Sequence, residues 1–115
     1  MSVTIYHNPR CSKSRQTLAL LRERGIEPAI VEYLETPPSA AALADILKLL
    51  GLAPRQLMRR KEAPYTALHL DDASLDDAAL IQAMVDNPVL IERPLVLANG
   101  KAALGRPPES VLAIL

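Results

Sequence analysis

The sequence predicts an α/β fold in which helices cover one mixed sheet. Two observations lead to it: half of the 115 residues are hydrophobic, and the predicted elements run strand, helix, strand, several helices, hairpin, helix. Because Phe and Trp are absent, the core must be aliphatic. A chain of this length is typical of a single domain, which we expect to span residues 1–115.

The chain opens with a predicted strand–helix–strand unit. Hydrophobic alternation over residues 3–6 predicts a strand, and the His-Asn-Pro sequence at residues 7–9 ends it as a turn. A helix is predicted over about residues 12–24, with Gly25 as its stop. Residues 28–35 predict a second strand, and such a unit makes the two strands parallel.

The middle of the chain predicts helices. One amphipathic helix ends at Gly51, and a short helix is predicted over residues 54–60. In the amphipathic helix that ends at Gly51, helical spacing predicts that four residues face the core: Leu43, Ile46, Leu47 and Leu50. Ser74 followed by Asp77 fits a capping box, which predicts a further helix with Ser74 as its N-cap.

The last part of the chain predicts a hairpin and a helix. Asn99-Gly100 between two apolar runs is a strong hairpin signal, and its strands must be antiparallel. A final helix begins at the Pro107-Pro108 pair, and we expect it to turn Val111, Leu112 and Leu115 inward.

Charge and cysteine content limit the function. Thirteen basic residues balance thirteen acidic ones, so nothing indicates a nucleic-acid or membrane partner. One cysteine excludes an internal disulfide framework. The first ten residues show no signal-peptide pattern, and we expect a cytoplasmic protein.

Cys11, the lone cysteine, lies where the first strand passes into the first helix. The free amides at the helix start and the nearby basic residues Arg10, Lys13 and Arg15 favour the thiolate and can also hold an oxyanion. The alternative is a small buried hydrophobic side chain. Because the flanking residues are polar, the sequence favours a reactive thiol.

Three motif tests narrow the chemistry of this thiol. Ser14 makes the motif C-x-x-S rather than a dithiol, and Thr17 stands where a cysteine-based phosphatase loop needs arginine. With one Cys and two His, we expect no metal site. A redox role would therefore need an outside thiol to resolve Cys11, such as glutathione, glutaredoxin or a second protein.

Two arginines precede prolines later in the chain, at Arg93 and Arg106. Guanidinium groups aimed at one pocket would suit a tetrahedral oxyanion, because each can bind two of its oxygens. Surface salt bridges explain the same residues equally well, so both interpretations stay open.

Five segments resemble a known family: IYHNPRCSKSRQTL, YLETPPS, LMRRKEAPY, NPVLIERPLVL and GRPPESVLAIL. They are similar to the glutaredoxin-coupled arsenate reductases of the ArsC type, and most of all to the YfgD branch. The resemblance covers nearly the whole chain in collinear order. It implies a thioredoxin-like fold with a four-stranded mixed sheet and a helical insertion between strands 2 and 3.

The resemblance also implies a reaction and its residues. Cys11 would attack arsenate and arsenite would be released, with glutathione as co-substrate, glutaredoxin as protein partner and no bound cofactor. The implied oxyanion ligands are Arg59, Arg93 and Arg106, and the implied thiolate-tuning residues are His7 and Ser14. The Arg93–Pro94 peptide bond is expected to be cis.

Three alternatives remain. The chain could be a glutathione-dependent thiol oxidoreductase with another substrate, needing no arsenate. It could be a redox regulator of the Spx type that binds RNA polymerase, although Ser14 removes the C-x-x-C switch that many such regulators use. It could also be a small α/β domain with an inert cysteine.

Overall fold

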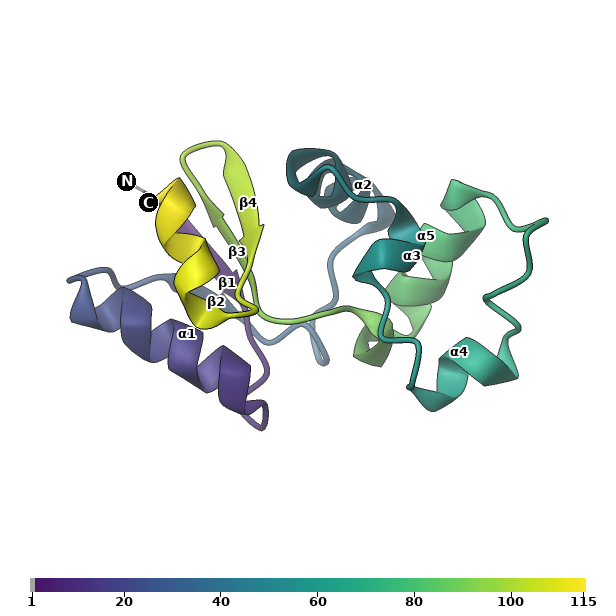
Figure 1. Cartoon of the computed structure of the whole chain (residues 1–115), viewed down its shortest axis with the longest axis horizontal. Helices are drawn as coiled ribbons and strands as arrows, with labels where there is room; N and C mark the ends of the chain where they lie inside the picture. The colour runs from purple at the N-terminus through teal and green to yellow at the C-terminus, as the bar shows by residue number, and fades with distance from the viewer. Residues whose placement is uncertain (1) are drawn as a thin grey trace. The chain divides into compact units, whose positions relative to one another are not determined.

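The computed structural model describes residues 2–115, which form a four-stranded mixed sheet and a set of helices (Figure 1). The strands are β1 (Val3–Tyr6), β2 (Ala29–Val31), β3 (Leu95–Ala98) and β4 (Lys101–Leu104). The α-helices are α1 (Ser12–Glu23), α2 (Ala40–Leu50), α3 (Pro54–Leu57), α4 (Ala63–Ala67) and α5 (Asp77–Asp86), and the 3₁₀ segments are η1 (Pro88–Leu90) and η2 (Pro108–Ile114). The predicted fold class is confirmed, including the helical insertion between β2 and β3.

The chain divides into two compact units. The first takes the residues up to Thr36 and those from Arg93 onward, and it contains the sheet, α1 and η2. The second unit is Pro37–Glu92 and contains α2 to α5 with η1. The prediction of a single domain over residues 1–115 stays a prediction.

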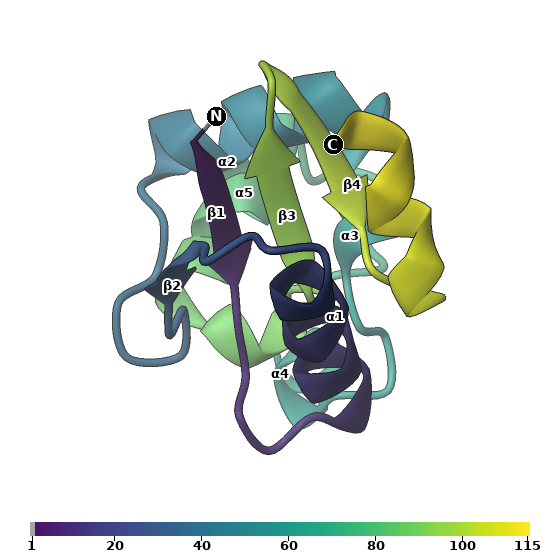
Figure 2. The ribbon, with the colours of Figure 1, turned by 90° about the vertical axis from the view of Figure 1, so that its left-hand side faces the viewer.

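The sheet of the first unit has the order β2-β1-β3-β4 (Figure 2). β1 and β2 are parallel, whereas β1–β3 and β3–β4 are antiparallel, so the predicted strand directions are confirmed. Ile5 pairs with Ile30 on one side and with Val96 on the other. The two central strands therefore come from opposite ends of the sequence.

An aliphatic cluster holds α1 and η2 to the sheet. Ile5, Leu21, Val96 and Val111 are fully buried in it. This cluster confirms the expectation of a core without Phe or Trp, and it fixes α1, the helix that follows the cysteine.

The strand β2 is shorter than predicted. Backbone pairing covers only residues 29–31, and the Glu35 and Thr36 amides then donate to the Glu32 carbonyl oxygen. These turn hydrogen bonds compete with the sheet ladder, so the β-favouring residues after 31 do not extend the strand.

The second unit confirms the amphipathic helix ending at Gly51. In α2 the Ser39 hydroxyl oxygen accepts a hydrogen bond from the Ala42 amide, and Gly51 ends the helix with φ of 69°. Its buried residues are Leu43, Ile46 and Leu47. The short helix predicted over 54–60 ends earlier, at Leu57, and α4 and η1 were not predicted at all.

The predicted cap of α5 is wrong. Asp76, not Ser74, is the N-cap, since its Oδ1 accepts from the Ala79 amide at 2.8 Å. The Ser74 hydroxyl instead donates to Asp72 Oδ1, also at 2.8 Å. Asp72 therefore holds Ser74 in a local turn before the helix begins.

The hairpin prediction is confirmed, with φ of 55° at Asn99 and 70° at Gly100. The last helix differs from expectation because it is a 3₁₀ segment. Its period of three brings Pro108, Val111 and Ile114 onto one buried side, whereas Leu112 and Leu115 are only half-buried.

Among residues 2–115, no helix has both the length and the apolar character needed to cross a membrane.

Candidate active site

Cys11 is the N-cap residue of α1 and closes a tight turn after β1. Its amide donates to the Asn8 carbonyl oxygen at 3.0 Å, and the Arg10 amide donates to Asn8 Oδ1 at 3.0 Å. At φ −92° and ψ 123° the residue is extended, which leaves its side chain at the helix start. The thiol is half-buried and forms no disulfide.

The surroundings of Cys11 lower the pKa of its thiol. Burial raises this pKa, but the backbone N–H of Ser14, the side chain of Arg93 and the backbone N–H of Lys13 stabilise the thiolate more strongly. The direction agrees with the sequence-based expectation. The helix amides contribute as expected, but the contributing cation is Arg93 rather than Arg10, Lys13 or Arg15.

Arg93 lies just before β3 and faces Cys11. Its Nε and Nη1 atoms are buried and have no hydrogen-bond partner within the described part of the chain. Buried donors are normally paired, and an unpaired guanidinium nitrogen costs free energy. The site therefore has capacity for an anion beside the thiol.

Arg106 lies in the same unit and next to Arg93. Its Nη1 donates to the backbone carbonyl oxygen of Arg93 at 3.3 Å, and its side chain is exposed. In the first unit Arg93 thus acts on the Cys11 thiol, and Arg106 contacts the backbone of Arg93. The Arg93–Pro94 peptide bond is cis, as the family resemblance implied, and so is the Arg106–Pro107 bond, which the sequence did not indicate.

His7 and Ser14 contact each other directly. Ser14 Oγ is fully buried, lies 2.6 Å from His7 Nδ1 and accepts a hydrogen bond from the Asn8 amide at 3.0 Å. Ser14 thus acts on Cys11 through its backbone N–H, while its hydroxyl contacts the imidazole. The thiolate-tuning roles of both side chains stay predictions.

His7 has a lowered pKa. The main cause is burial; the Glu32 carboxylate opposes it, and the guanidinium groups of Arg22 and Arg15 add to it. The imidazole is therefore biased toward its neutral form.

Arg59 belongs to the second unit. Its Nε lies 3.3 Å from Glu62 Oε1, and its Nη1 lies 3.7 Å from Glu92 Oε2. Its amide donates to the Leu90 carbonyl oxygen at 2.7 Å, while Arg60 is exposed. The role of Arg59 as an oxyanion ligand stays a prediction.

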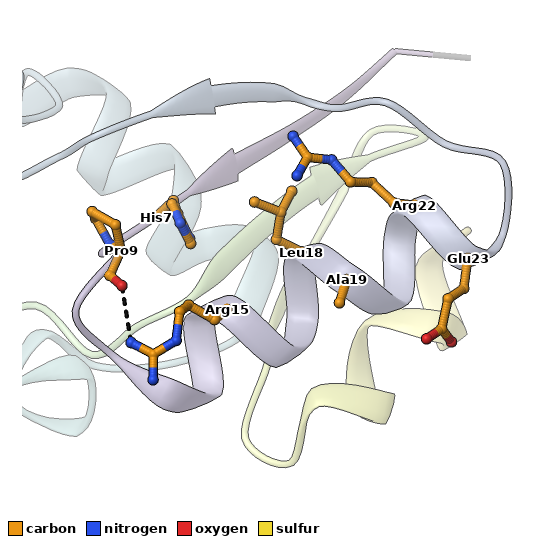
Figure 3. A pocket seen from close by; sticks show the side chains of 7 residues that line it. All are labelled: His7, Pro9, Arg15, Leu18, Ala19, Arg22 and Glu23. Atoms are coloured by element: carbon orange, nitrogen blue, oxygen red, sulfur yellow. Dashed lines mark hydrogen bonds between the residues drawn. The ribbon is translucent and has the colours of Figure 1, made fainter.

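A pocket of about 640 Å³ runs along α1 in the first unit (Figure 3). Its lining residues are His7, Pro9, Arg15, Leu18, Ala19, Arg22 and Glu23. Arg15 Nη1 donates to the Pro9 carbonyl oxygen at 2.9 Å, which braces the turn before Cys11 (Figure 3). Cys11 itself is not among the lining residues.

Sequence reasoning missed Gly105, which directly precedes Arg106 and is buried against Thr17 and Pro94. The sequence offers one signal for it, a glycine placed before an Arg-Pro pair. Nothing in the local pattern shows which distant residues the glycine contacts.

Comparisons of sequence and of structure both match this chain, over nearly its full length, to ArsC-type proteins. The sequence profile described as the ArsC family matches residues 6–114. The uncharacterized protein YfgD of Escherichia coli strain K12 is 65% identical over 114 residues, which are 98% of this chain and 96% of that protein. An arsenate reductase of Neisseria meningitidis serogroup B is 55% identical, with 98% of this chain and 97% of that protein covered. The solved structure of the arsenate reductase from Vibrio cholerae superposes with a TM-score of 0.97 at 56% identity, covering 100% of this chain and 98% of that one.

Proposed function

The chain belongs to the ArsC family, and we propose on that basis that it reduces arsenate to arsenite, with Cys11 as the nucleophile. The observation that carries the proposal is the contact between a thiol of lowered pKa and the Arg93 side chain, whose Nε and Nη1 are buried without partners among the described residues. A nucleophile and an unused anion-binding group lie side by side. Similarity to relatives named arsenate reductase supports arsenate as that anion.

The first step is attack by the Cys11 thiolate on arsenic. A sulfur–arsenic bond forms, and one arsenic–oxygen bond breaks as hydroxide leaves. The helix amides at Lys13 and Ser14, together with Arg93, stabilise the negative charge around the thiolate and the bound oxyanion. Arg106 is the second oxyanion ligand in the first unit, and Arg59 is the third ligand of the proposal.

The next step uses glutathione as reductant. Its thiolate attacks the Cys11 sulfur, and arsenic leaves with the electron pair of the sulfur–arsenic bond as arsenite. Arsenic gains two electrons, and Cys11 becomes a mixed disulfide with glutathione. Because Cys11 is the only cysteine of the chain, glutaredoxin must then attack this disulfide and free the Cys11 thiolate. Such thiols prevail in the reducing cytoplasm, where we place the reaction.

Arsenate-dependent oxidation of glutathione, measured with glutaredoxin and freshly reduced protein, tests the proposed function. We expect saturable turnover that is lost in Cys11→Ser, because a serine hydroxyl does not ionise near neutral pH. Without glutaredoxin, mass spectrometry should find glutathione on Cys11 after one turnover. Absence of turnover at millimolar arsenate in the reduced wild-type protein would refute arsenate as the substrate.

Protection of Cys11 from alkylation separates this proposal from a thiol oxidoreductase with another substrate. Arsenate should slow alkylation by iodoacetamide in a concentration-dependent manner, and Arg93→Ala should remove that protection. Glutathione disulfide tested alone provides the comparison. Protection by glutathione disulfide but by no oxyanion would favour the oxidoreductase instead.

A further inference from the structure

Gly105 differs from the other glycines of the chain. Gly25, Gly51 and Gly100 all have positive φ, and a Cβ added to any of them would meet nothing within 4 Å. At Gly105 an added Cβ would lie 2.6 Å from Thr17 Oγ1 and 2.7 Å from Pro94 Cγ. Space, rather than backbone conformation, therefore requires glycine at position 105.

Thr17 supplies one side of this close approach. It is fully buried, and its Oγ1 donates to the Lys13 carbonyl oxygen at 2.8 Å, which holds the side chain against its own helix. Thr17 lies on α1, the helix capped by Cys11. An atom that pushes Thr17 away therefore moves the helix that presents the thiol.

Pro94 supplies the other side. It is buried, follows Arg93 directly, and accepts a hydrogen bond from the Gly105 amide through its carbonyl oxygen at 2.9 Å. Gly105 is followed directly by Arg106, whose Nη1 donates to the Arg93 carbonyl oxygen. Gly105 is therefore linked to Arg93 through its hydrogen bond with Pro94 and to Arg106 through the chain itself.

We propose that the Thr17–Gly105–Pro94 contact is the positioning device that sets the separation between the Cys11 end of α1 and the two arginines, Arg93 and Arg106. The inference rests on the proposed function, because it assigns those arginines to the oxyanion. Thr17 and Gly105 act through other residues and are positioning residues. The contact lets α1 and the Arg93–Pro94 segment approach more closely than a Cβ at position 105 would permit without a shift of Thr17 or Pro94.

Gly105→Ala tests the proposal. The added methyl group must force Thr17 and Pro94 apart, which moves Arg93 away from the thiol. We expect a raised Cys11 pKa, seen as a shift of the alkylation rate profile to higher pH, and a severalfold rise in KM for arsenate that exceeds the fall in kcat.

Second-site changes at Thr17 relieve one of the two close contacts, that with Thr17 Oγ1, while the contact with Pro94 remains, so we expect partial recovery. Thr17→Ala removes the oxygen that the new Cβ would meet, whereas Thr17→Ser keeps it. Combined with Gly105→Ala, the alanine change should bring the alkylation profile back toward wild type, and the serine change should not. Equal recovery in both double variants, or in neither, would overturn the proposal.

Val3→Ala is the control for general loss of stability. Val3 is buried in the same unit, in the strand end remote from His7. Its variant should be destabilised without any shift of the Cys11 profile, and an equal shift there would reduce Gly105 to a structural role and overturn the inference.

A separate variant keeps the proposal testable if Gly105→Ala does not fold. Thr17→Leu adds bulk to the same contact from the helix side and should also move the alkylation profile to higher pH. An unchanged profile in folded Thr17→Leu contradicts the proposal. Because alkylation needs no arsenate, these results stand apart from the test of arsenate reduction.

Discussion

Arg93 combines two properties at the level of the single residue. Its side chain lowers the pKa of Cys11, and two of its buried nitrogens have no hydrogen-bond partner among residues 2–115. Arg93→Ala should therefore raise the Cys11 pKa and slow alkylation at neutral pH. The measurement is the rate of iodoacetamide alkylation against pH.

Arg24→Ala is the matched control for Arg93→Ala, because it removes one positive charge at the far end of α1. It should leave the alkylation profile unchanged. If both variants shift the profile equally, net charge rather than the local contact controls the thiol.

His7 gives a pH dependence of stability. Its pKa is lowered in the folded state, mainly by burial, so the unfolded chain binds a proton more readily. The free energy of unfolding should thus be highest above the unfolded pKa of about 6.5 and should fall as the pH drops through the folded pKa. Urea denaturation at several pH values measures it.

His7→Asn provides the comparison for this pH dependence. Asparagine can still form a hydrogen bond with Ser14 Oγ but does not titrate. The variant should lose the part of the acid-side destabilisation that belongs to His7. A pH profile identical to wild type would show that other groups cause the loss.

The sequence indicated part of the site at this scale. Cys11 could be found because its chemistry depends on neighbours in sequence, the turn and the helix start. Arg93 and Arg106 were ambiguous without the family resemblance, since only the folded chain brings Arg93 to the thiol and Arg106 to the Arg93 backbone. Gly105 was missed because its requirement for glycine depends on two side chains remote in sequence.

At the level of the element, the N-cap assigned to α5 can be tested directly. Asp76 caps the helix through Oδ1, while the Ser74 amide and hydroxyl both donate to Asp72 Oδ1. Asp76→Ala should lower the free energy of unfolding by about 1 kcal/mol. Guanidinium denaturation measures the change.

Ser74→Ala and Asp76→Asn complete the test of this cap. Because Ser74 makes only exposed hydrogen bonds, its loss should cost less than about 0.5 kcal/mol. Asparagine at position 76 should retain most of the stability. A larger loss in Ser74→Ala than in Asp76→Ala would contradict the assigned cap.

Elements with strong local signals were predicted well. β1, α1, α2 and the hairpin each have a clear hydrophobic period and a stop residue such as Gly25, Gly51 or Gly100, and the structure confirms all four. β2 ended earlier than predicted because hydrogen bonds to the Glu32 carbonyl oxygen form a turn there instead of a longer strand. The last helix is 3₁₀ rather than α-helical, and it buries Ile114 instead of Leu112 or Leu115.

At the level of the whole molecule, the aliphatic cluster determines the stability of the first unit. Leu21 on α1 is fully buried within it, whereas Leu34 is 43% exposed. Leu21→Ala should cost about 2–5 kcal/mol, because it removes buried surface and leaves a cavity. Chemical denaturation provides the value.

Leu34→Ala is the matched control for Leu21→Ala, with the same chemical change at an exposed position of the same unit. Its cost should stay near 0.5 kcal/mol or less. Similar losses in the two variants would show that the cluster does not dominate the stability of this unit.

The order of synthesis gives the first unit a further property. The N-terminal segment carries the cysteine, but its central partner strand β3 and Arg93 lie beyond the whole of Pro37–Glu92. A growing chain emerges from the ribosome N-terminus first. The thiol therefore remains without Arg93, and without the strand β3 that pairs with β1, until the whole of Pro37–Glu92 has been translated. A nascent chain stalled before residue 93 would carry a cysteine at the start of α1 that lacks the contribution of Arg93, and the anion site would form only after that arginine has been added.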